Sequence, residues 1–281
     1  MLLSAVIHLK ALENGSLPAD LGPALRAEFL NWVGDADSGH SDHLHDGDEL
    51  RPYTISDLKG SFQAQRGFRL IQAGQSAWFR VTSLREKETR LLLDSVFPAI
   101  RSRKFTLIRT GFQVQKVAVA AEEHPWARQT AYPSLVEKYF KADPHPAEAL
   151  DVEFTSPTTF HAGKVHVPLP LPENVLGSWL KRWNACSSAS LPREVHRLEE
   201  ARLVLSRYKL ETRAVHYEKA TWIGFEGSCR FRVLAEDEFW LRLCNLLTDF
   251  AFFCGTGAKT SFGLGQTRRT HEMDRRDSEQ G

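Results

Sequence analysis

The chain has 281 residues, of which 42% are hydrophobic and 25% are charged, a composition typical of globular proteins with one large domain or two average ones. Thirty-six basic against 35 acidic residues give a formal net charge of +1, which excludes a uniformly basic surface, so any polyanion site must come from local clustering. No apolar run reaches the length of a membrane span.

The N-terminal ten residues alternate like a strand and lack the positive segment and cleavage site of a signal peptide. The four cysteines, at positions 186, 229, 244 and 254, have no C-x-x-C spacing, which indicates buried thiols rather than a zinc site. We therefore expect a cytoplasmic protein.

The first half of the chain predicts a β-α-β-β-α-β order. Alternation of apolar residues predicts strands at 2–9, 52–58, 67–71, 77–82, 105–108 and 114–120. Helical spacing predicts a helix that begins at the N-cap Asp20 and ends at Gly34, and a second helix over 84–100. This order is that of a ferredoxin-like unit.

A segment rich in Pro, Ala and His at 121–147 indicates a domain boundary, with domains at 1–140 and 141–281. The second half predicts strands at 151–155 and 264–269, helices at 175–183 and 236–253, and a long hairpin from 200–213 and 220–234. The predicted fold class is therefore α+β, with two tandem ferredoxin-like (RRM-like) domains and a C-terminal glycine-rich loop.

The glycine-rich loop runs from residue 255 to 269 and follows a helix that Gly255 is expected to stop. Glycine backbone can approach a ligand closely, and exposed N–H groups beside fixed cations suit phosphate. The spacing matches neither the P-loop nor the dinucleotide fingerprint, and the alternative is a flexible turn. The predicted binding residues are Gly255, Gly257, Lys259, Thr260, Gly263, Gly265, Gln266, Arg268 and Arg269.

A shorter polar motif, residues 155–160, follows the predicted strand at 151–155. Its hydroxyls, Thr158 among them, could lie near phosphates, although a simple strand exit is the alternative.

A polar loop after the first helix carries His40, His43 and His45 within six residues. Histidine is the general acid or base that works near neutral pH. The loop could instead be a solvated segment, or a metal site that uses the neighbouring aspartates. Its spacing matches no zinc or calcium signature.

Three segments together, 44–56, 154–160 and 252–266, resemble the CRISPR repeat-processing endoribonucleases of the RAMP superfamily. The resemblance implies two tandem ferredoxin-like domains that need neither metal nor cofactor. It also implies cleavage of repeat RNA in precursor transcripts to give guide RNAs, as part of antiviral defence. The chemistry implied is attack by a 2′-hydroxyl, which leaves a 2′,3′-cyclic phosphate and a 5′-hydroxyl.

The resemblance also assigns roles. His45 matches the family histidine and Arg51 the basic residue six positions later. Some members use a tyrosine in the first helix, where this chain has Leu30. Either His40 or His43 covers that role, or catalysis rests on His45.

The implied partners are CRISPR repeat RNA, subunits of a CRISPR effector complex and a second copy of the chain, with no membrane. Two alternatives are a non-catalytic RNA-binding subunit of an effector complex and a metal-dependent phosphoesterase.

Overall fold

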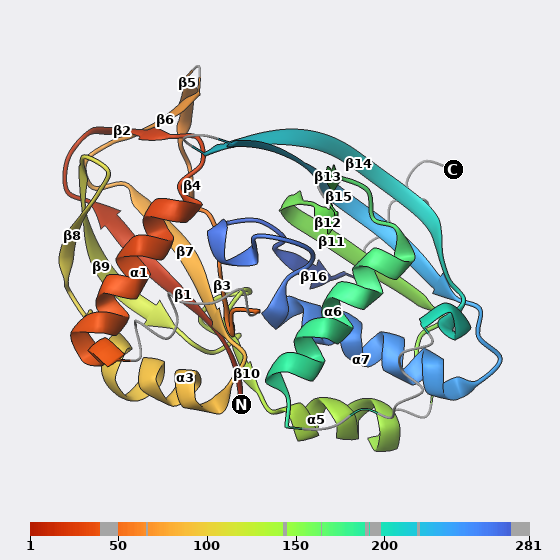
Figure 1. Ribbon diagram of the computed structural model, residues 1–281. Coiled ribbons are helices and arrows are strands. Elements are labelled where there is room, and N and C mark those ends of the chain that lie inside the picture. The colour runs from red at the N-terminus through yellow and green to blue at the C-terminus, as the bar shows by residue number, and fades with distance from the viewer. Residues whose placement is uncertain are drawn as a thin grey trace. The chain divides into compact units, whose positions relative to one another are not determined.

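The computed structural model describes residues 1–39, 50–65, 67–142, 145–163, 165–188, 191, 198–217 and 220–270. The chain divides into two compact units (Figure 1). Unit 1 comprises Met1–Thr130 with Ser261–Gly263, and unit 2 comprises Ala131–Thr260 with Leu264–Gly281. The boundary expected from the sequence, at 140–141, lies within a helical segment of unit 2 that begins with α5 (Tyr132–Glu137).

Unit 1 contains an antiparallel sheet in the order β3 (Tyr53–Ile55), β7 (Ser76–Ser83), β1 (Leu2–Ala11), β9 (Thr110–Ala118) and β8 (Lys104–Leu107). β4 (Lys59–Gly60) pairs with β7, and β10 (Arg128–Thr130) pairs with β1. The helices are α1 (Gly22–Ala36), α3 (Glu86–Leu91) and α4 (Phe97–Ala99), the last two joined by a π-helical segment, Leu92–Val96. Strands β3, β7, β1 and β9 are thus the second, third, first and fourth of a ferredoxin-like unit.

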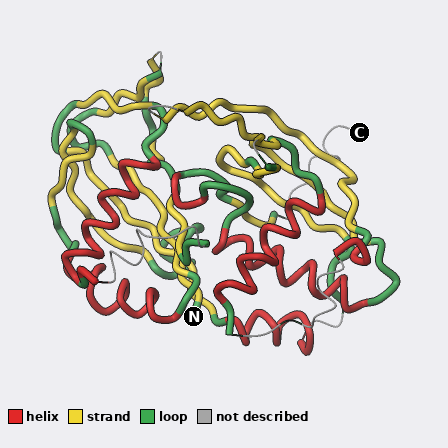
Figure 2. The backbone as a smooth tube through the Cα atoms, viewed as in Figure 1, coloured by secondary structure: helices red, strands yellow, loops and turns green. Residues whose placement is uncertain are grey.

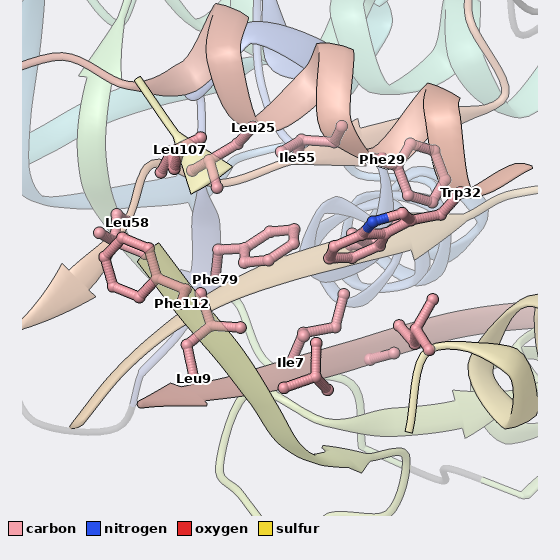
Figure 3. Packing of buried hydrophobic residues seen from close by; sticks show 14 of the residues in the cluster. Ile7, Leu9, Leu25, Phe29, Trp32, Ile55, Leu58, Phe79, Leu107 and Phe112 are labelled. Carbon is pink, nitrogen blue, oxygen red and sulfur yellow. The ribbon is translucent and has the colours of Figure 1, made fainter. Parts of the chain in front are cut away.

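The core of unit 1 lies between α1 and this sheet (Figure 3). Successive strand residues point to opposite faces, so Ile7 and Leu9 of β1 reach the helix side together. Residues of α1 at helical spacing pack against these two side chains; they include Phe29 and Trp32, each 1% exposed. The alternating apolar residues of β1 and the apolar stripe of α1 therefore pack against each other in one core.

A small three-stranded sheet in unit 1 was not predicted. It has the order β2 (Gly15–Pro18), β6 (Phe68–Ile71) and β5 (Gln63–Gln65). β6 corresponds to the predicted strand at 67–71 but pairs in this ribbon, not in the main sheet. Short strands with exposed polar residues carry little alternation, which is why β2 and β5 were missed.

Unit 2 repeats the arrangement with the sheet order β14 (Leu203–Tyr217), β15 (Ala220–Val233), β11 (Ala149–Thr158) and β16 (Thr267–Arg269). The two long helices are α6 (Pro172–Cys186) and α7 (Glu238–Cys254). Again the strands are the second, third, first and fourth, so the predicted tandem ferredoxin-like fold is confirmed. Figure 2 shows β14 and β15 as one long ribbon, which is the predicted hairpin.

Smaller elements complete unit 2. α5 continues into a π-helical segment, Lys138–Ala142. β12 (Phe160–Ala162) pairs with β13 (Val165–Val167) in a two-stranded hairpin. Short 3₁₀ turns occupy Leu198–Ala201 and Thr260–Phe262. Among the helices of the described ranges, none has the length and hydrophobicity that crossing a membrane requires.

Three local predictions are wrong. Asp20 is not the N-cap of α1: Leu21 holds that position, and its N–H donates to Asp57 Oδ1 at 2.9 Å. The helix also continues through Gly34 to Ala36, since an interior glycine only weakens a packed helix. The last strand, β16, is shorter than the predicted 264–269 because residues 264–266 belong to the glycine-rich loop.

The cysteine prediction holds for three of four thiols. Cys229, Cys244 and Cys254 are buried, whereas Cys186 at the end of α6 is half-buried. Burial raises the pKa of both Cys229 and Cys244 to about 12.

Candidate functional site

Arg51 lies just before β3 in unit 1, and its guanidinium stands over an aromatic ring. Its Cζ is 5.5 Å from the centroid of Phe262, which belongs to the 261–263 segment of the same unit. Arg26 of α1 approaches the same ring, at 5.0 Å. Cations at this range are attracted to the electron-rich face of a ring. The structure thus gathers two guanidiniums around Phe262.

The charge of this arginine pair is not neutralised within the described part of the chain. Neither guanidinium has a carboxylate partner there, and Arg51 Nε is buried without a hydrogen-bond partner. Arg26 Nε donates to the hydroxyl oxygen of Tyr53 at 3.0 Å. Burial raises the pKa of Tyr53, so its hydroxyl stays protonated at neutral pH and does not act as a base. The pair is suited to an anion.

Backbone contacts hold Phe262 in place. Gly263 N–H donates to the Ile55 carbonyl at 3.1 Å, and Gly263 forms a parallel bridge with Ser56. At the start of α1, a Cβ added to Gly22 would lie only 1.9 Å from the Phe262 carbonyl oxygen. The absence of a side chain at Gly22 therefore permits the close approach of α1 to this segment.

The histidine loop itself lies outside the described residues. His40, His43 and His45 are all in the undescribed range 40–49, whereas Arg51 is described. Their catalytic roles therefore remain predictions. Arg26 and Phe262 are members of the site that sequence reasoning missed, because a single arginine on a helix and a phenylalanine in a loop carry no distinguishing pattern.

The glycine-rich loop begins where predicted, at the C-cap of α7. Gly255 has φ of 65°, and Gly257 and Gly265 have φ of 74° and 68°. A Cβ on Gly257 would lie 2.3 Å from the Thr159 carbonyl oxygen, and one on Gly265 would lie 2.1 Å from that of Thr256. These glycines are therefore needed for the loop to pack against its own backbone, whatever ligand it binds.

Side chains of helix α6 donate hydrogen bonds to this loop. Arg182 is buried, and its Nη2 donates to Thr260 Oγ1 at 2.7 Å and to the Gly257 carbonyl at 3.4 Å. Trp179 Nε1 donates to Thr256 Oγ1 at 2.8 Å. Desolvation lowers the pKa of Arg182. Sequence reasoning missed this support, since the contacts join residues more than seventy positions apart.

The predicted RNA-binding residues divide by exposure. Buried members are Gly255, Thr260, Gly263, Gly265, Gln266 and, in the polar motif, Thr158. The hydroxyl of Thr158 donates to the Ser156 carbonyl at 3.0 Å, so it stabilises the strand and does not face outward. Partly exposed members are Gly257, Lys259, Arg268 and Arg269.

The two terminal arginines of the loop have acidic partners inside unit 2. Arg268 Nε lies 2.6 Å from Glu153 Oε2, and Arg269 Nη1 lies 3.6 Å from Asp249 Oδ1. Lys259 instead places its Nζ 5.0 Å from the Trp222 ring centroid.

Comparison with known proteins gives matches to one family. Residues 152–267 match the family model of the CRISPR-associated endoribonuclease Cas6. No curated protein is similar enough in sequence to match the chain.

A solved Cas6 product complex is 29% identical with a TM-score of 0.74, covering 96% of this chain and 100% of that one. A Cas6 substrate mimic complex is 28% identical with a TM-score of 0.69, covering 96% and 100%. A Cas6 from Thermus thermophilus is 23% identical with a TM-score of 0.71, covering 96% and 98%.

These matches confirm the resemblance that the three sequence segments indicate. The Cas6 family model covers most of unit 2, and the likeness to the solved Cas6 structures extends over both units. The chain is thus similar to the Cas6 endoribonucleases and has a RAMP-type fold.

Proposed function

We propose that the chain is an endoribonuclease that cuts CRISPR repeat RNA in precursor transcripts and so releases guide RNAs. The observation that carries the proposal is the arginine pair on Phe262, two cations without carboxylate partners among the described residues, close in sequence to a histidine-rich loop. The matches to an endoribonuclease family model and to Cas6 product and substrate mimic complexes support the same reaction class.

The reaction would be an internal transesterification. The 2′-oxygen attacks the adjacent phosphorus while a base takes its proton, and the bond from phosphorus to the 5′-oxygen breaks while an acid supplies a proton to that oxygen. The products are a 2′,3′-cyclic phosphate and a 5′-hydroxyl, and no metal takes part. Such a step needs a base, an acid and a cation for the charge that develops on the phosphorane.

Arg51 would supply that cation, with Arg26 beside it. A guanidinium is always charged and presents several donors to phosphate oxygens. Because Phe262 and the ends of α1 and β3 hold both side chains, their charge is in place before the reaction, which is the condition for strong electrostatic stabilisation.

His45 would act as the general acid or base, with His40 or His43 as the second group. A histidine-to-alanine mutant is among the solved Cas6 structures that resemble this chain, at 26% identity. Tyr53 is not an alternative base, since burial raises its pKa.

RNA would be held by the glycine-rich loop, chiefly through Lys259 and the half-exposed backbone of Gly257. Thr260, Gln266 and Thr158 would shape the loop from inside. Arg268 and Arg269 would contribute less than their sequence positions suggest, because Glu153 and Asp249 already compensate them.

The test is cleavage of the cognate repeat RNA under single turnover in EDTA. Cutting should proceed without divalent metal, and a 2′-deoxy nucleotide at the cut site should abolish it. His45→Ala should slow cleavage by about 10²-fold or more at nearly constant affinity. The control is His145→Ala, which removes an exposed histidine of unit 2.

Arg51→Ala should also reduce the rate by about 10²-fold, more than it weakens binding, because its charge matters most in the transition state. Arg109→Ala, on an exposed turn of unit 1, is the matched control. Tight RNA binding with no cleavage in any condition would instead favour a non-catalytic subunit. Cleavage that is lost in EDTA and restored by Mg²⁺ would favour a metal-dependent phosphoesterase.

A further inference from the structure

Unit 2 carries a connected row of aromatic rings that the proposed chemistry does not use. His161 and His166, on β12 and β13, have ring centroids 4.5 Å apart. His166 lies 6.1 Å from Trp222 on β15, and Trp222 lies 5.0 Å from Tyr217 on β14. We call these four residues the ring cluster. It joins the short hairpin to the β14–β15 ribbon, whose strands lie side by side in Figure 1.

The ring cluster also contacts the glycine-rich loop. Lys259 Nζ stands 5.0 Å from the Trp222 centroid. Lys259 is a non-glycine residue with φ of 57°, a conformation that costs an ordinary side chain energy. The loop thus holds the Lys259 backbone in this conformation, with the ammonium group beside the Trp222 ring.

Much of the cluster is accessible. His161 is exposed and the other three rings are half-buried. Desolvation, followed by the charges of His166 and Lys259, lowers the pKa of His161. At neutral pH the His161 ring is therefore uncharged, and Lys259 supplies the positive charge.

We propose that the ring cluster and Lys259 bind an unpaired segment of the RNA, with a base against the His161 and Trp222 rings and a phosphate at Lys259. Aromatic rings beside a cation are the means by which proteins hold single-stranded nucleic acid, because every base offers a flat face and every linkage a negative charge. Paired bases do not offer that face. The identity of the RNA rests on the proposed function, but the stacking site does not.

The experiment measures binding of two probes, single-stranded oligouridylate and the cognate repeat RNA. Trp222→Ala and His161→Ala should each weaken binding of oligouridylate by roughly tenfold, the scale of one lost stacking contact. His161→Ala keeps the test decisive if Trp222→Ala fails to fold, since His161 is exposed. Tyr208→Ala, which removes a 65% exposed ring from the same ribbon, is the matched control and should have no effect.

The lysine is tested by salt dependence. Lys259→Asn removes the charge with a residue that tolerates positive φ. It should flatten the slope of log K against log salt by about 0.7 for one phosphate on a single strand, whereas His161→Ala should leave the slope unchanged. A photoreactive uridine in the repeat RNA should crosslink to His161 or Trp222.

Unchanged affinity for both probes in both ring variants would overturn the proposal, as would a loss no larger than that of Tyr208→Ala. If no RNA is cut but the ring variants still weaken oligouridylate binding, the proposed function fails and the stacking site stands. If the His161→Ala variant cuts saturating repeat RNA at the normal rate but no longer binds oligouridylate, both the proposed function and the stacking site are supported. Absence of any oligouridylate binding by the wild-type chain would refute the stacking site alone.

Discussion

Arg182 offers a direct test of whether the glycine-rich loop is built by helix α6. We consider Arg182→Met, which keeps much of the side-chain volume but removes the Nη2 group that donates both hydrogen bonds to the loop. The adjacent residue, Lys181, is exposed on the same helix, so Lys181→Met removes one positive charge without touching the loop. The comparison separates loss of charge from loss of support.

The magnitude follows from the contacts. The 2.7 Å bond to Thr260 Oγ1 is charge-assisted, and such bonds contribute about 1.5–3 kcal/mol, while the 3.4 Å contact with the Gly257 carbonyl is weaker. Relief of the desolvation cost of a buried cation offsets part of this loss. We expect the free energy of unfolding of unit 2 to fall by about 2 kcal/mol, which lowers Tm by roughly 4–8 °C for a domain of this size.

RNA affinity should fall as well, because the loop must then be ordered at the moment of binding. An ordering cost of about 1 kcal/mol corresponds to roughly fivefold in Kd. Chemical denaturation would measure stability, and a filter-binding titration with repeat RNA would measure affinity. The reasoning is refuted if Arg182→Met loses stability but binds RNA as tightly as Lys181→Met, since the loop would then not depend on Arg182 or not contact RNA.

Three further predictions concern local chemistry. Gly22→Ala should destabilise unit 1 by about 1–3 kcal/mol, because its Cβ would meet the Phe262 carbonyl. Gly39→Ala, whose Cβ would lie 3.7 Å from the nearest atom of the described residues, should be nearly neutral in chemical denaturation. Burial lowers the pKa of His8 and His124, so the unfolded state binds more protons than the folded state. The free energy of unfolding should therefore fall as the pH drops below about 6.5. Denaturant titrations at several pH values should show that His124→Gln makes the free energy of unfolding less dependent on pH. The thiol of Cys186 should react first with a disulfide reagent, because the other three thiols are buried and a pKa of about 12 leaves almost no thiolate at Cys229 or Cys244. A fast phase that survives in Cys186→Ser would contradict this.

The order of the main elements could be read from the sequence because each buries one regular face. Ile7 and Leu9 alternate on β1, and Phe29 and Trp32 recur at helical spacing on α1. The elements that were missed lack such a face. β5 is wholly exposed, and α5 is only six residues long and begins beside a proline inside a segment interpreted as a boundary.

The candidate site was only partly predictable, because its geometry depends on contacts between distant residues. Arg51 could be named because the family resemblance places a basic residue six positions after His45. Arg26 could not, since only the folded chain brings it to Phe262. The sequence also could not show that Arg268 and Arg269 pair with Glu153 and Asp249, residues far from them along the chain.

The distinction between these cations explains how a chain with a net charge of +1 could bind a polyanion. A carboxylate partner cancels the field of an arginine, as Asp151 does for Arg230 and Glu153 for Arg268. An aromatic ring fixes a cation without cancelling its charge, because the ring is electrically neutral. Arg26 and Arg51 on Phe262 are held in this second way, and among the described residues no carboxylate cancels their charge. Where an aromatic ring and not a carboxylate contacts an arginine, the surface keeps a local positive charge that the overall composition does not reveal. Substitution of these arginines should therefore lower RNA affinity more than substitution of other basic residues.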